Sequence, residues 1–215
     1  MKKYLLIPLL LFPLIAGCSF NGVRGNGNME SEYRDVGEFS KIDVSGRFDV
    51  EVTVGKPTSV EIIAEENLLK FIRTKVRNNV LIISNKENIR PRKDLIIKVT
   101  TPNLDAVDCS GANDLFIENI NTDRFSIDLS GAGSIKMNGR GEKLYIDISG
   151  AADLEASKFI VEDVTIDISG AASAEIFASN SLDAEISGAS SIKLYGDAQK
   201  VKTDISGVAS FSRVK

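Results

Sequence analysis

The chain has 215 residues and a formal net charge of −4; apolar residues make up 43% of it and aromatic residues only 7%. That length accommodates one or two domains, and the acidic balance argues against nucleic acid or an anionic membrane surface as a binding partner. The sequence has no histidine, so the most frequent general base, pH switch and metal ligand is missing.

The first residues have the zones of a bacterial secretory signal. Two lysines precede an apolar run over residues 4–14, which is too short to span a membrane comfortably as a helix. The phrase Ile-Ala-Gly-Cys that ends at Cys18 resembles a lipobox. We therefore predict a lipoprotein signal peptide over residues 1–17 and acyl chains on Cys18 that anchor the protein to the outer membrane. The alternative is an ordinary cleaved signal with a coincidental cysteine.

Residues 18–32 are polar and rich in glycine, and we predict that they form a flexible tether. They lack the run of acidic residues directly after Cys18 that is associated with export of such lipoproteins to the outer face. The sequence therefore predicts a location in the bacterial cell envelope and leaves both the periplasmic and the surface face open.

Residues 33–103 contain short β-rich runs separated by turn residues. We predict a small antiparallel β-module that caps the N-terminal end of the repeats that follow, because stacked repeats need a cap for solubility. One of its loops, residues 90–93, has the sequence Arg-Pro-Arg-Lys. This basic loop is either a solvated hairpin tip or a contact for an anionic glycan or lipid headgroup.

Residues 104–215 repeat a Ser-Gly pair every 18–20 residues. Apolar residues occupy alternate positions before each pair, and a shorter alternating run follows it, which is typical of two strands joined at a tight corner. We predict an all-β fold in which about five to six coils form a parallel β-solenoid. Because parallel crossovers are normally right-handed, we expect a right-handed β-helix. The glycines of the repeat are Gly111, Gly131, Gly150, Gly170, Gly188 and Gly207.

Stacked coils align equivalent residues into columns. One inward column would place Cys109 among leucine and isoleucine side chains, so we predict a buried, unreactive thiol. An outward column would bring Lys136 beside Glu155 and Glu175 beside Lys193 on adjacent coils. The last coil has no evident cap, so a partner, a second copy of the chain or its own charges must protect its open edge. The full inward column is Cys109, Leu129, Ile148, Ile168, Ile186 and Ile205.

Another outward column carries an acidic residue on every coil. Calcium takes oxygen ligands and could bridge three of these residues, Asp128, Asp147 and Asp167. The alternative, which we favour, is a row of solvated carboxylates and no metal site, because the nonapeptide motif of calcium-binding β-helices is missing. The column consists of Asp108, Asp128, Asp147, Asp167, Glu185 and Asp204.

Several phrases together resemble the head GIN domain family. They are Phe-x-x-Ile-x-Val-Ser-Gly over residues 39–46, Leu-Ile-Ile over residues 81–83, Val-Thr-Thr-Pro-Asn-Leu over residues 99–104, and the repeated Ser-Gly-Ala turns. Members of this family are all-β, are common in Bacteroidetes and are described as auto-transporter adhesins. The resemblance implies a surface-binding protein and supplies no catalytic motif to transfer.

Three functions remain open from the sequence. We favour a non-catalytic cell-envelope lipoprotein that acts as an adhesin, binding or scaffold protein, with a glycan or a protein as its ligand and no cofactor. The second is a carbohydrate-active β-helix enzyme, against which the short loops and the few exposed aromatic residues argue. The third is a structural protein that forms homo-oligomers through its C-terminal coil.

Overall fold

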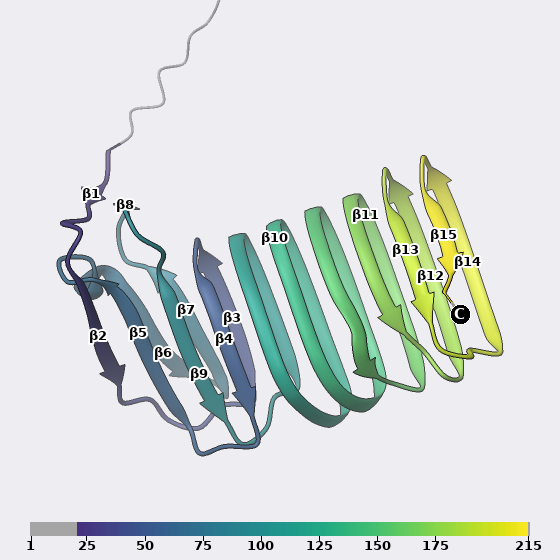
Figure 1. Ribbon diagram of the computed structural model, residues 1–215, viewed down its shortest axis with the longest axis horizontal. Helices are drawn as coiled ribbons and strands as arrows, with labels where there is room; N and C mark the ends of the chain where they lie inside the picture. Colours follow the sequence, from purple (N-terminus) through teal and green to yellow (C-terminus); the bar gives the residue numbers. More distant parts are fainter. Residues whose placement is uncertain (1–20, 215) are drawn as a thin grey trace, which may run out of the picture.

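The computed structural model describes residues 21–214, so the predicted signal peptide and Cys18 lie outside the described residues. Within that range the fold is all-β, and its only helical element is the short 3-10 turn η1 (Leu69–Phe71). None of the described helical residues forms a helix long and apolar enough to cross a membrane. Figure 1 shows the strands as successive turns of the chain, with β1 (Val23–Arg24) near one end of the row and β15 (Ser210–Arg213) at the other.

The described part of the N-terminal half, from residue 21 on, contributes nine strands to this arrangement. Most are six or seven residues long and bury alternate side chains, as expected for strands with one face on a core. They are β1 (Val23–Arg24), β2 (Met29–Arg34), β3 (Lys41–Gly46), β4 (Asp49–Val54), β5 (Ser59–Glu65), β6 (Ile72–Arg77), β7 (Val80–Asn85), β8 (Ile89–Arg90) and β9 (Ile96–Thr101).

In the C-terminal half every pairing between different strands is parallel. One series of neighbouring strands is β10, β11, β12 and β14, each paired with the next. The long strand β11 also begins a second series, in which it pairs with β13, and β13 pairs with β15. The repeat predicted from the sequence sets the register, since Gly150 lies opposite Gly170 and Gly188 opposite Gly207. The strands are β10 (Ala106–Ile160), β11 (Asp163–Phe177), β12 (Ser181–Gly188), β13 (Ser191–Tyr195), β14 (Lys200–Gly207) and β15 (Ser210–Arg213).

The predicted antiparallel module is only partly antiparallel. Strands β2, β5 and β9 pair in that way, and so do β6 and β7. However, β3 is parallel to both β7 and β10, and β4 is parallel to both β9 and β10. The phrase Ser45-Gly46 lies opposite Ser110-Gly111, so β3 and β4 carry the register of the repeats back into the N-terminal half. The sheet is therefore mixed. The pairings of β3 and β4 with β10 cross the boundary that the sequence predicted at residue 103.

The predicted flexible tether over residues 18–32 is wrong for the part that the structure describes. Strand β1 pairs in parallel with β8, and β2 pairs along its whole length with β5. Side chains add to this, because Asn67 donates to the carbonyl of Arg24 and accepts from the backbone N–H of Asn26. These contacts are long-range, which is why a local composition of glycine and asparagine did not predict them.

The repeated glycines form a column at the corner of the coils. Gly150 has a φ of +144° and Gly170 a φ of +147°, a backbone region that favours glycine. A Cβ atom at Gly150 would clash with the backbone carbonyl of Gly131 on the preceding coil, and one at Gly170 would clash with Gly150 in the same way. Each glycine is therefore required both by its own backbone conformation and by the close approach of its neighbour.

One hydrophobic core extends from Phe39 to Ala198. The predicted inward column is buried from Cys109 to Ile186, and Cys109 is a free thiol that is only 4% exposed. The prediction of a buried cysteine is confirmed, and burial raises the pKa of the Cys109 thiol to about 12, which disfavours the reactive thiolate. The column prediction is wrong at its last member, since Ile205 is 41% exposed. No further described coil packs on it.

Candidate functional site

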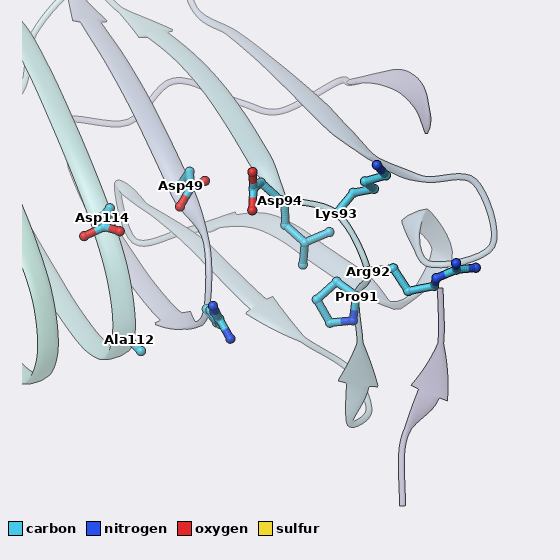
Figure 2. A pocket seen from close by; sticks show the side chains of 9 residues that line it. Asp49, Pro91, Arg92, Lys93, Asp94, Ala112 and Asp114 are labelled. Carbon is cyan, nitrogen blue, oxygen red and sulfur yellow. The ribbon is translucent and has the colours of Figure 1, made fainter. Parts of the chain in front are cut away.

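A shallow polar pocket of about 370 Å³ lies where the N-terminal strands meet the first turn of β10. Three of its lining residues are the carboxylates Asp49 on β4, Asp114 on β10 and Asp94 in the loop before β9, as Figure 2 shows. Arg47 lines the same pocket, and Arg92 and Lys93 come from the basic loop that follows β8. The pocket thus places cations and carboxylates around one hollow.

The backbone fixes two of the three carboxylates on adjacent coils. Asp49 and Asp114 are register partners in the parallel pairing of β4 with β10. Burial raises the pKa of Asp49, the neighbouring charges of Asp94 and Asp114 raise it further, and Arg47 partly opposes them. Asp114 accepts hydrogen bonds from the backbone N–H and the hydroxyl of Ser134, at 3.1 and 2.6 Å. Such a group suits ionic contacts with a polar ligand.

The basic loop beside the pocket is held by a buried carboxylate. Glu65, at the end of β5, has no exposed surface. Its carboxylate accepts the backbone N–H of Gly27 at 2.6 Å and that of Arg92 at 2.7 Å. Burial alone would raise the pKa of Glu65, but these backbone donors, with that of Lys93, lower it. The loop is therefore more than the solvated hairpin tip that one interpretation predicted; Glu65 joins it to the segment after β1.

The predicted acidic column exists as a row in parallel register. Asp147 lies opposite Asp167, and Asp167 opposite Glu185, on successive coils. Asp43 extends the row into β3, where it lies opposite Asp108. Burial raises the pKa of Asp147, and the charges of Asp128 and Asp167 add to that increase. The row is a set of carboxylates that repel one another across adjacent strands.

The calcium prediction for Asp128, Asp147 and Asp167 gains no support from this geometry. Among residues 21–214, no group of three or more acidic or cysteine side chains could hold a metal ion. A straight row on adjacent strands offers one carboxylate per coil, whereas calcium requires six to eight oxygen ligands around one point. A calcium site remains a prediction from the sequence alone.

The charge pairs predicted for the other outward column are confirmed. Lys136 lies 2.7 Å from the carboxylate of Glu155, and Lys193 lies 2.9 Å from that of Glu175. Three of the four side chains are exposed and Glu175 is half-buried, so each pair contributes little to the free energy of unfolding. The two pairs support the predicted register of the coils, because each joins side chains that are 18–19 residues apart in the sequence and lie on adjacent coils.

The pocket was not predicted from the sequence, although the repeat contains a signal for two of its carboxylates. The phrase Ser45-Gly46 matches the repeated pair Ser110-Gly111, and Asp49 and Asp114 each lie three residues after the glycine of their pair. Extending that alignment would have paired the two carboxylates. Asp94, Arg92 and Lys93 carry no such signal, because they lie in the loop between β8 and β9, outside the repeat.

Comparisons with known proteins give a consistent result. The model of a family described as "Putative auto-transporter adhesin, head GIN domain" matches residues 38–198. A solved structure of a "putative adhesin" from Bacteroides fragilis is 23% identical, with a TM-score of 0.75, and the match covers 90% of this chain and 100% of that one. A "putative lipid binding protein" from Parabacteroides distasonis is 19% identical, with a TM-score of 0.56 and coverage of 91% and 100%. At these identities the two structures share the fold. No curated protein matches the chain.

Proposed function

This chain belongs to the head GIN domain family, and on that premise we propose that it is a non-catalytic binding protein of the adhesin type in the bacterial cell envelope. The resemblance that the sequence analysis identified is thereby confirmed. We further propose that the coils form a right-handed β-solenoid, that Cys18 carries the acyl chains of an outer-membrane lipoprotein, and that the ligand is a glycan or a protein.

The main support for this proposal is the outer surface of the coils. Successive strands in parallel register present rows of equivalent polar side chains, among them the acidic row and the two Lys–Glu pairs. A surface of this kind repeats the same contacts along its length, which suits the recognition of an extended ligand. The pocket lined by Arg47, Asp49 and Asp94 adds one site with both signs of charge.

Lipid anchoring predicts a change of cell fraction. The full chain should be found in the membrane fraction, whereas a Cys18→Ser variant should move to the soluble fraction, because a thiol is required for acyl attachment. Membrane fractionation followed by immunoblotting measures this, with Cys109→Ser as the control that leaves the anchor intact. Retention of the Cys18→Ser variant in the membrane fraction would contradict the anchor.

Ligand binding can be tested with the soluble Ser19–Lys215 fragment on arrays of glycans and matrix proteins. We expect saturable binding to at least one class of ligand, weakened about tenfold or more by Arg47→Ser or Asp94→Asn when the pocket makes the contact. Both positions are exposed, so the folded state should tolerate these substitutions. An absence of binding on both arrays would contradict the function proposed here. The release of shortened glycans would favour the carbohydrate-active enzyme, with Asp49, Asp94 and Asp114 as its candidate carboxylates.

A further inference from the structure

The last coil leaves an open edge that is partly apolar. Strand β14 pairs only with β12, and β15 only with β13, so no other described segment covers their outer edges. Ile205 is 41% exposed, whereas Ile186, its register partner on the coil before, is 2% exposed. Val208, in the turn between β14 and β15, is 85% exposed. An open edge with exposed apolar side chains is a surface for strand pairing.

The sequence of β14 is complementary to itself when the strand is reversed. Antiparallel pairing about Thr203 sets Lys202 opposite Asp204 of a second copy, and Asp204 opposite Lys202 of that copy. The same register sets Val201 opposite Ile205 of the second copy. The apolar side chains on the core-facing side of one strand therefore lie next to those of the other. A two-fold axis through Thr203 therefore satisfies both the charged and the apolar positions of the strand.

The neighbouring coil explains why this register favours association. In the single chain, Asp204 lies opposite Glu185, at the end of the acidic row. Lys202 lies 3.0 Å from Asp183 of the preceding coil, so its charge already faces a carboxylate on one side. Pairing would bring Asp204 a cation and Lys202 a second carboxylate. Asp204, the last residue of the acidic row in one copy, would thus lie opposite Lys202 of the other copy.

We propose that two copies of this chain associate tail to tail through antiparallel pairing of β14, in the register that sets Lys202 opposite Asp204. The interface is isologous, so it closes after two copies and forms a dimer without extending into a filament. The pairing requires no membrane anchor. Its consequence for adhesion does rest on the anchoring proposed above, since β1 and β15 lie at opposite ends of the row of strands. A tail-to-tail dimer would then carry its two anchors at opposite ends and join two membranes.

Charge reversal at the two positions tests the register. Sedimentation equilibrium of the Ser19–Lys215 fragment should give a dimer. The Lys202→Glu variant and the Asp204→Lys variant should each dimerise at least about tenfold more weakly, because like charges then oppose each other twice. An equimolar mixture of the two variants should recover the dimer, because every opposed pair in the mixed dimer is again of opposite sign.

The control is Asp183→Asn, which removes the pair with Lys202 inside one chain and should leave the dimer unchanged. The mixture also guards against misfolding, since variants that had lost their fold would not recover association. The proposal is overturned by a monomeric wild-type fragment, by a Lys202→Glu variant that dimerises normally, or by an open-ended series of oligomers. Each outcome is independent of lipid attachment, so a failure here is distinguishable from a failure of the proposed anchoring.

Discussion

Substitution of Gly150 by alanine should unfold the coil stack at a much lower temperature. The residue has a φ of +144°, and a Cβ atom there would clash with the carbonyl of Gly131, which is backbone and cannot rotate away. The two effects together should lower the free energy of unfolding by about 3 kcal/mol or more. For a domain of this size that loss corresponds to a decrease in Tm of roughly 6–12 °C, measurable by circular dichroism.

Two other glycines separate the causes of this effect. Gly55 also has a positive φ, of +86°, but a Cβ atom there would meet nothing within 4 Å. Gly55→Ala should therefore show only the cost of the backbone conformation, about 1 kcal/mol. Gly37 is open and has no positive φ, so Gly37→Ala should leave Tm nearly unchanged. Equal losses at Gly150 and Gly55 would mean that the coils do not approach each other as closely as the structure indicates.

Substitution of Glu65 by glutamine should be nearly as costly. The buried carboxylate accepts the backbone N–H of Gly27 with one oxygen and that of Arg92 with the other, and glutamine would replace one of these oxygens by an NH2 group that faces a backbone donor. Hydrogen bonds to a charged group are worth about 1.5–3 kcal/mol each, so we expect the variant to lose about 2–3 kcal/mol of stability. Chemical denaturation at pH 7 measures the difference, and Glu66→Gln, one residue further and exposed, is the matched control.

The cost of Glu65→Gln should depend on pH in one direction. The pKa of Glu65 in the folded state is below its ordinary value of 4.5, so its stabilising contribution is complete above that value. It decreases as the pH falls through the lower pKa of the folded state, where the carboxylate becomes protonated. The difference between wild type and variant should therefore be constant near neutral pH and shrink below about pH 4. A difference that grew on acidification would contradict the ionised, hydrogen-bonded state of Glu65.

The part of the fold that repeats was predictable from the sequence, because each residue of a coil has counterparts on the others. Alternation of apolar residues predicted the strands, and alignment of the Ser-Gly pairs predicted the partners of Lys136 and Lys193. The burial of Cys109 followed from the same alignment. Equivalent residues of different coils share the same structural environment, so each copy of the repeat gives further evidence for where a side chain lies. A sequence without repeats contains no such copies.

The errors lie where one residue has no counterpart. Residues 18–32 were predicted to be a tether because glycine and asparagine are typical of flexible segments, yet Glu65 and Asn67 bind the described part of this segment from about forty residues away. Ile205 was expected to be buried like its equivalents, but it lies on the last described coil, and no other described segment packs on its outer side. The pocket combines one repeated position with loop residues, so only Asp49 and Asp114 could have been paired from the sequence.

Vesicle aggregation tests the central claim, that this protein is an adhesin anchored at one end and paired at the other. The Cys18–Lys215 fragment can be coupled to lipid through Cys18 alone, since Cys109 is buried and its pKa is raised to about 12. Vesicles that carry the wild-type fragment should aggregate, and light scattering should rise. Vesicles with Lys202→Glu should stay dispersed until vesicles with Asp204→Lys are added. Wild-type vesicles that stay dispersed, or Lys202→Glu vesicles that aggregate alone, would contradict the claim.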